Sequence, residues 1–298
     1  MLNFKSIEVP IHIGTFFFMK KTIYFLFTKS VGLYINFLSF LVPEKATQLA
    51  YTLFSEPRDG KLYKEKLPAV LQETEKETYH HKDSHFQTYT WKGNDTIILL
   101  AHGWESNASR WKNILPYLRK SGSTIIAIDA PAHGLSGGKE FNIPQYAEFI
   151  DVIVQKFKPQ YLIGHSLGAK TCLYYQSTYL DNSIEKTVVL GSPSDFKIIL
   201  NNYIEMLSLN SIISGGLEAH YLKNFNIKLE NFSGQLFAAA IQTKGLIAHD
   251  RDDTIVLFEE GKKIASTWKD AIFIETSGLG HSMHSDELYK KIFQFLFD

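Results

Sequence analysis

Residues 160–175 read Q-Y-L-I-G-H-S-L-G-A-K-T-C-L-Y-Y, and the prediction of the fold starts from them. The first five letters form an apolar run typical of a buried strand, whereas A-K-T-C-L-Y-Y is typical of a helix. Between them lies the motif Gly164-His165-Ser166-Leu167-Gly168, which has the form G-x-S-x-G. The stretch therefore predicts a strand, a sharp turn that carries Ser166, and a helix.

Similar short apolar runs lie on both sides of this stretch. They are residues 96–101 (T-I-I-L-L-A), 124–129 (T-I-I-A-I-D) and 187–190 (T-V-V-L), with longer helical segments between them. Continuous apolar runs suit strands that are buried on both faces of a parallel sheet. Residues 85–91 alternate in the manner of an edge strand. The alternation of strands and helices predicts an α/β fold, with a mostly parallel central sheet and helices on both faces.

The alternation stops after Pro193. Residues 194–243 have helical periodicity and no clear strand, and two strand-like runs follow at residues 245–248 and 271–275. We therefore predict a helical cap at residues 194–243, inserted before the last two strands and lying over Ser166. Its apolar side chains favour an apolar substrate pocket; they include Tyr203, Met206, Leu207 and Leu209.

Polar residues follow both of the last two strands. The segment after residue 248 reads H-D-R-D-D-T-I-V, and the segment after residue 275 reads T-S-G-L-G-H. A serine hydroxyl is a weak nucleophile and needs a histidine base, which in turn needs a carboxylate to orient it. In sheets of this kind the order along the chain is serine, acid, histidine, each at the carboxyl end of a strand. These two segments meet that demand.

Four motifs together resemble the α/β-hydrolase family, over residues 85–298. H-D-R-D-D-T-I-V is similar to the acid loop of the family, and G-L-G-H to its histidine loop. Residues 101–104 (A-H-G-W) resemble its oxyanion segment, and residues 129–136 (D-A-P-A-H-G-L-S) resemble another loop common in the family. The resemblance implies the α/β-hydrolase fold with a helical cap insertion.

The resemblance also implies an activity and a set of site residues. It implies a serine hydrolase that cleaves a carboxylic ester or thioester through an acyl-enzyme, and that needs no metal or organic cofactor. The expected site residues are Ser166 as nucleophile, His281 as base, Asp253 as acid, and the backbone N–H groups of Trp104 and Leu167 as oxyanion donors. The expected partner is a small, lipophilic acyl ester.

Several alternatives stay open at this point. Asp250 and Asp252 are neighbours of Asp253, and Asp195 follows the preceding strand, so each is a candidate for the acid. His284 is the alternative base. Acyl transfer or other chemistry on the same residues is a rival function. An inactive, hydrolase-like binding module, associated with a membrane, is a rival of another class.

The N-terminal 43 residues differ from the rest in composition. An apolar run covers residues 22–42, and Lys29 is its one charge. We expect a packed, peripheral or membrane-associated helix; a membrane span and a secretory signal are the alternatives. Met19-Lys20-Lys21 resembles a start of translation, which would make residues 1–18 an extension. Residues 44–84 are expected to be helices and linkers that lead into the catalytic domain.

Charge and cysteine content exclude some classes of partner. Lys plus Arg and Asp plus Glu each number 31, so the net charge is zero and no nucleic-acid partner is indicated. The single cysteine, Cys172, cannot form a disulfide within the chain. We therefore expect a cytoplasmic protein, associated with the inner face of a membrane if the N-terminal segment binds lipid.

Overall fold

The computed structural model describes residues 11–180 and 182–298 of the chain. The chain divides into two compact units. The helical unit comprises Met1–Tyr51 and Ile198–His220, and the sheet unit comprises Thr52–Lys197 and Tyr221–Asp298. The N-terminal segment and part of the expected cap therefore belong to one unit.

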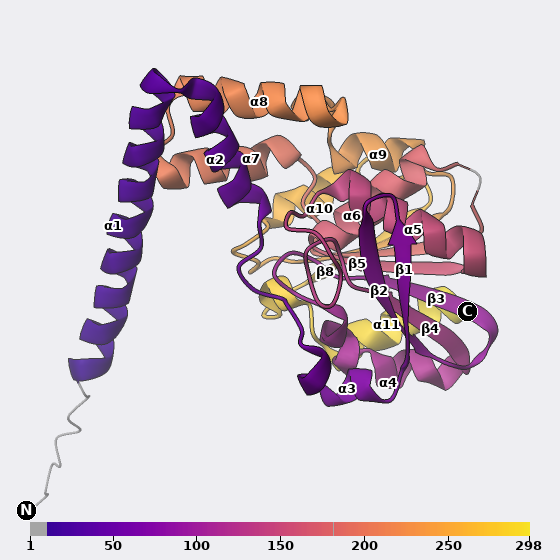
Figure 1. The fold of residues 1–298 in the computed structure, drawn as a ribbon. Helices are drawn as coiled ribbons and strands as arrows, with labels where there is room; N and C mark the ends of the chain where they lie inside the picture. Colours follow the sequence, from indigo (N-terminus) through magenta and orange to yellow (C-terminus); the bar gives the residue numbers. More distant parts are fainter. Residues whose placement is uncertain (1–10, 181) are drawn as a thin grey trace, which may run out of the picture. The chain divides into compact units, whose positions relative to one another are not determined.

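A single sheet organises the sheet unit (Figure 1). Among the described residues it has eight strands in the order β1-β2-β4-β3-β5-β6-β7-β8. The strands are β1 (Glu75–His81), β2 (Ser84–Trp91), β3 (Asn94–Ala101), β4 (Ser123–Ile128), β5 (Tyr161–His165), β6 (Lys186–Leu190), β7 (Lys244–Asp250) and β8 (Ala271–Thr276). Strand β2 pairs antiparallel with β1 and β4, whereas every other pair is parallel. The prediction of a mostly parallel sheet is confirmed.

Helices cover both faces of this sheet. The α-helices of the chain are α1 (Ile11–Leu41), α2 (Pro43–Ser55), α3 (Ala69–Gln72), α4 (Leu115–Leu118), α5 (Ile143–Phe157), α6 (Leu167–Thr178), α7 (Phe196–Leu207), α8 (Ser211–Phe225), α9 (Gly234–Ala240), α10 (Phe258–Ala265) and α11 (Asp286–Phe297). Side chains of α4 and α11 pack on one face, and side chains of α6, α9 and α10 pack on the other. Helix α5 packs beside α6.

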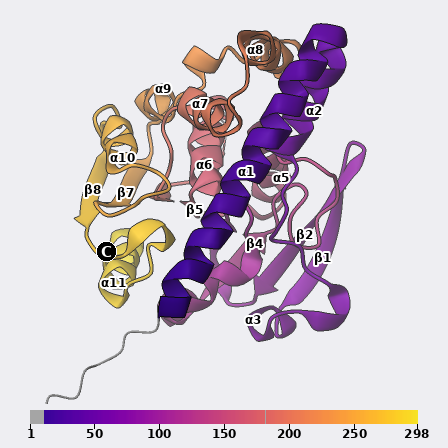
Figure 2. The same ribbon diagram turned by 90° about the vertical axis from the view of Figure 1, so that its left-hand side faces the viewer.

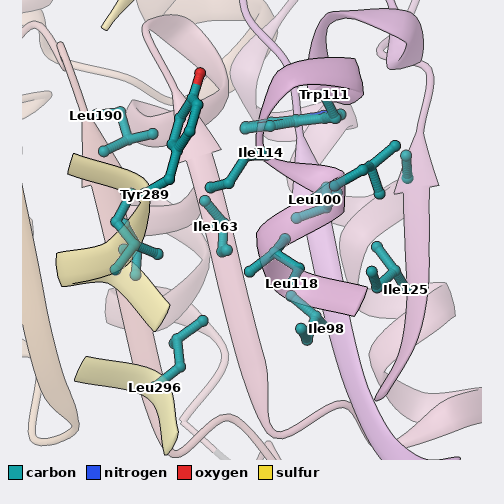
Figure 3. Close-up of a cluster of buried hydrophobic side chains, with 14 of the residues drawn as sticks. Ile98, Leu100, Trp111, Ile114, Leu118, Ile125, Ile163, Leu190, Tyr289 and Leu296 are labelled. Carbon is teal, nitrogen blue, oxygen red and sulfur yellow. The ribbon is translucent and has the colours of Figure 1, made fainter. Parts of the chain in front are cut away.

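Two apolar cores follow from the two-residue period of the strands. Successive side chains of a strand point to opposite faces. In β6, Val188 accordingly belongs to the core under α4 and α11, whereas Val189 belongs to the core under α6, α9 and α10. Figure 3 shows the first of these cores, where Ile163 from β5 lies between α4 and α11. Continuous apolar strands are therefore required, because both faces are buried.

One strand was not predicted. Residues 44–84 were expected to be helices and linkers, but residues 75–81 form β1, which pairs with β2 along its whole length. The prediction that residues 85–91 form an edge strand is therefore wrong, because β2 lies between β1 and β4. The sequence of β1, E-K-E-T-Y-H-H, lacks apolar alternation since most of its side chains are exposed. Charged side chains on an edge strand also oppose pairing with other chains.

The N-terminal apolar segment forms one helix, α1, of 31 residues (Figure 2). Residues 1–10 lie outside the described residues, and with them part of the extension expected before Met19. In the part of the chain that the structure describes, no helix has the length and apolar content of a membrane span. The domain boundaries at residues 43, 84 and 194–243, and the place of the cap over Ser166, stay predictions.

Candidate active site

The turn between β5 and α6 holds Ser166 in a strained conformation. Its φ is 54° and its ψ is −125°, backbone angles that residues other than glycine rarely adopt. A Cβ at Gly164 would lie 2.5 Å from the Cα of Ala169, and one at Gly168 would lie 2.3 Å from the carbonyl oxygen of Ala101. Both glycines are therefore needed for the turn to pack closely against its surroundings.

A histidine from the end of the sheet meets this serine. His281 follows β8, and its Nε2 lies 2.9 Å from the Oγ of Ser166. Its Nδ1 lies 2.7 Å from the Oδ2 of Asp253. Since a carboxylate only accepts hydrogen bonds, Nδ1 carries a proton and Nε2 of the neutral ring is free to accept one. The structure thus brings together the serine, histidine and aspartate that the sequence indicated.

Asp253 is held in place by its own loop. Its Oδ1 accepts hydrogen bonds from the backbone N–H groups of Ile255 and Val256, both at 2.9 Å. Burial acts to raise its pKa, but hydrogen bonds from His249, His281 and Val256 outweigh burial and hold the pKa far below its usual range. Asp253 is therefore ionised at neutral pH. His249, which the sequence analysis did not single out, lies with Nε2 at 3.5 Å from Oδ2.

The neighbouring aspartates have other partners. The carboxylate of Asp250 accepts from the hydroxyl of Thr276 at 2.7 Å and from the N–H groups of Leu279 and Gly280 at 3.1 Å. Asp252 accepts from the N–H of Gly278 at 2.8 Å. These contacts join the acid loop to the segment that carries His281. Burial acts to raise the pKa of Asp250, but these hydrogen bonds hold it below its usual value.

The two remaining alternatives also have partners elsewhere. Asp195 accepts from the hydroxyl of Ser233 at 2.7 Å and from the Nζ of Lys263 at 2.8 Å. His284, the alternative base, lies before the start of α11, and its Nδ1 is 2.5 Å from the hydroxyl of Tyr289. Asp195 therefore does not take the place of Asp253 beside His281, and His284 does not take the place of His281 beside Ser166.

The two expected oxyanion donors lie at the start of α6 and in the loop after β3. Leu167 is the first residue of α6, whose N-terminal N–H groups favour negative charge. Trp104 follows β3, and the segment before it passes close to the serine, since a Cβ at Gly103 would lie 2.8 Å from the Cβ of Ser166. The N–H of Glu105, which has a φ of 47°, donates to the Nε2 of His133 at 2.9 Å. This bond fixes the segment that carries Trp104.

His102 and His133, which lie in two of the loop motifs, are neutral at pH 7. His133 has Nδ1 at 2.8 Å from the carbonyl oxygen of Pro131, and burial lowers its pKa to about 4. His102 accepts from the N–H of Ala130 at 2.9 Å, and burial lowers its pKa well below the usual value. Each ring therefore presents one unprotonated nitrogen to a backbone N–H. Both histidines therefore hold loop backbone in place through these contacts.

A buried lysine on α6 was not anticipated. Lys170 lies one turn after Ser166, and its Nζ donates to the carbonyl oxygens of Ser194 and Phe232, the latter at 3.1 Å. Burial lowers its pKa to about 7, against the opposing charges of Asp195 and Glu260. Lys170 thus ties α6 to the segments before α7 and before α9. No sequence motif indicated this contact, because it joins segments far apart in the chain.

Comparison with known proteins agrees with the fold. The family model of the alpha/beta hydrolase fold matches residues 96–234. A bifunctional esterase/perhydrolase from Acinetobacter calcoaceticus is 24% identical, over 64% of this chain and 87% of its own. A monoacylglycerol lipase from Mycolicibacterium smegmatis is 27% identical, over 28% of this chain and 33% of its own.

Solved structures agree on the architecture. An esterase from Pyrococcus furiosus superposes with a TM-score of 0.60 at 19% identity, over 81% of this chain and 98% of its own. A thioesterase domain from the curacin biosynthetic pathway superposes with a TM-score of 0.55 at 16% identity, over 76% of this chain and 99% of its own. The chain has the α/β-hydrolase fold. Its distant relatives include esterases and a lipase.

Proposed function

We propose that the protein hydrolyses carboxylic esters or thioesters through an acyl-enzyme on Ser166. The observation that carries the proposal is the hydrogen-bonded series from Asp253 to His281 at 2.7 Å and from His281 to Ser166 at 2.9 Å. Nucleophile, base and orienting acid within hydrogen-bond reach are what acyl transfer by a serine needs. The esterase and lipase names of the distant relatives support the same class of substrate.

In the acylation step, Ser166 attacks the carbonyl carbon of the ester. Nε2 of His281 takes the hydroxyl proton as the Oγ–C bond forms, and the ionised Asp253 stabilises the resulting imidazolium. The N–H groups of Trp104 and Leu167 are the proposed donors to the tetrahedral oxyanion. The intermediate then collapses, and His281 gives its proton to the departing alcohol or thiol.

In the deacylation step, water replaces the alcohol. Nε2 of His281 takes a proton from water as its oxygen attacks the acyl carbon, and the same N–H donors hold the second oxyanion. Collapse of this intermediate returns the proton to Ser166 and releases the carboxylic acid. His281 needs to be neutral at the start of both steps, because its Nε2 has to accept a proton in each of them.

The apolar pocket inferred from the insertion loses part of its support. Tyr203, Leu207 and Leu209 are buried, and the hydroxyl of Tyr203 donates to the carbonyl oxygen of Ala50 at 2.8 Å. Tyr203 therefore packs α7 on α2 inside the helical unit. A lipophilic acyl group stays a proposal that rests on the relatives.

A fluorophosphonate probe tests the proposal, because it phosphonylates only an activated serine. Wild type should be labelled at Ser166, and the label should be lost in Ser166→Ala and in His281→Ala. An unrelated exposed serine, changed in Ser266→Ala, serves as the matched control and should leave labelling intact. Equal labelling of wild type and Ser166→Ala would refute Ser166 as nucleophile, and an inactive binding module would show no label at all.

We further expect Asp250→Asn to lower kcat on the order of 100-fold, with KM changed far less. The amide presents N–H hydrogens to one of the N–H groups of Leu279 and Gly280, so the segment before His281 shifts, and a shift of about 1 Å costs about that much. Asp252→Asn is the matched control, because it makes the same chemical change two residues further along the chain. Its kcat should stay within about 3-fold of the wild-type value. A kcat for Asp250→Asn equal to that for Asp252→Asn would show that Asp250 does not position His281.

A further inference from the structure

Helix α1 has an exposed face made of apolar side chains. Eight of them are each between 57% and 72% exposed and define what we name the outer face: Ile23, Leu26, Phe27, Leu33, Tyr34, Phe37, Phe40 and Leu41. Of the residues from 23 to 41 whose side chains are described, the other exposed residues are Phe25, whose ring lies under the Nζ of Lys29, and Ser30. The hydroxyl of Ser30 donates to the carbonyl oxygen of Phe27 at 2.8 Å, within the helix. None of the described residues exposed on this stretch carries a charge.

The opposite face of α1 holds its polar side chains. Nζ of Lys29 donates to the hydroxyl of Ser208 at 2.7 Å, and Asn36 donates to the carbonyl oxygen of Ser208 at 2.8 Å. Asn36 also accepts from the N–H of Asn210 at 2.8 Å, and the side chain of Asn210 donates to the hydroxyl of Ser39. These partners all belong to the helical unit, so the polar groups of α1 face its interior.

Helices α1 and α7 also approach each other closely. A Cβ at Gly32 would lie 1.7 Å from the carbonyl oxygen of Leu207, so only glycine fits at this point of contact. Lys29 donates in addition to the carbonyl oxygen of Glu205 at 3.0 Å, near the C-terminal end of α7. The negative end of the dipole of α7 lies there, so the single charge of the apolar run is matched inside the unit.

This distribution is the reverse of that of a helix on the surface of a water-soluble domain. Such a helix buries its apolar stripe and exposes its charges. In contact with hydrocarbon, polar groups have to be satisfied inside the protein, and small residues allow helices to approach closely. Helix α1 meets both conditions, over about 28 Å of its length at 1.5 Å per residue. Single exposed apolar residues are ordinary, but a contiguous face of this size marks a contact surface.

We propose that the outer face of α1 binds a lipid surface, with its aromatic and aliphatic side chains in the boundary between headgroups and acyl chains. An interface with a protein partner would be expected to contain about one hydrogen bond per 100–200 Å². The outer face offers the hydroxyl of Tyr34 beside seven hydrocarbon side chains, and the neighbouring hydroxyl of Ser30 is already bonded within the helix. A lipid surface needs no such groups, and Phe and Leu on one helix face are typical of interfacial binding. The binding is hydrophobic and does not require anionic lipid.

Sedimentation with sucrose-loaded vesicles of phosphatidylcholine tests this proposal on the full chain. Wild type should sediment with the vesicles, and raising NaCl from 0.1 to 0.5 M should not release it, because hydrophobic contacts are not screened. The double variant Phe37→Glu/Phe40→Glu should bind at least about 100-fold more weakly, at about tenfold for each lost aromatic contact. The matched control Tyr63→Glu removes an exposed aromatic ring outside α1 and should bind as wild type does.

A second measurement guards against misfolding of the glutamate variant. Cys172 is buried, so an environment-sensitive dye on Tyr34→Cys would report from the outer face alone. Its emission should shift to the blue on addition of vesicles, whereas the same dye on Lys290→Cys, exposed on α11, should not respond. Wild type that stays in the supernatant, or a Tyr34→Cys dye that does not respond, overturns the proposal.

One outcome would point to another occupant. Light scattering without vesicles could show a wild-type dimer that the double variant Phe37→Glu/Phe40→Glu dissociates. If wild type in addition does not sediment with vesicles, a second copy of the chain covers the outer face and the lipid proposal fails. None of these readouts uses catalysis, so they stand or fall separately from the proposed hydrolase activity.

Discussion

Replacing Ser166 by alanine is expected to reduce kcat for ester hydrolysis on the order of 10⁶-fold, as loss of the nucleophile does in a known serine hydrolase. The variant retains the oxyanion donors, so it should still exceed the uncatalysed rate. The loss should appear in kcat, because the hydroxyl contributes to bond formation and not to substrate binding. Initial rates with p-nitrophenyl esters of graded chain length would measure both constants and the acyl preference.

The fold of this variant needs its own check. Ser166 lies in a strained turn with φ of 54°, and alanine has the same Cβ, so backbone strain is unchanged. Unfolding by denaturant should therefore give nearly the same midpoint for both proteins. An alanine variant that keeps more than about 1% of kcat would assign the reaction to another group.

Exchanging Asp253 for asparagine is expected to lower kcat about 10⁴-fold. The variant Asp253→Asn offers an amide where Nδ1 of His281 now donates at 2.7 Å, so the ring adopts the other tautomer and Nε2 can no longer accept the serine proton. The positive charge that forms on His281 during the reaction also loses its counter-charge. Steady-state kinetics of Asp253→Asn, beside Ser166→Ala, would measure the effect.

Three aspartates at the end of β7 and in the loop after it allow an internal comparison. Asp253 contacts His281 directly, Asp250 contacts the segment before it, and the carboxylate of Asp252 accepts from the N–H of Gly278. The three asparagine variants should therefore lose activity in the order Asp253, Asp250, Asp252. If Asp250→Asn were the most impaired of the three, Asp253 would not be the acid.

Local pattern was sufficient for the strands that are buried on both faces. Residues 96–101 and 187–190 read as strands because parallel strands under two layers of helices must be apolar throughout. The same rule failed for β1, whose seven residues are mostly exposed and polar. Its conformation depends on pairing with β2, and pairing partners leave no local signature in a strand of this composition.

Site residues with a motif were also within reach of the sequence. Ser166 sits in a glycine-flanked turn, and His281 follows the last strand, so spacing and order were enough to nominate them. The choice among Asp250, Asp252 and Asp253 was not, because all three follow the same strand. His249 and Lys170 carry no motif at all, and only the packing around them gives them partners.

The sequence by itself determined the parallel sheet, the serine turn and the order of the polar loops, because these depend on residues close together in the chain. Only the tertiary structure decided which aspartate reaches His281, that β1 completes the sheet, and that α1 joins residues 198–220 in one helical unit. The physical reason is distance along the chain. Side-chain contacts between segments some 30 to 180 residues apart depend on how the elements pack, and local periodicity carries no record of that packing.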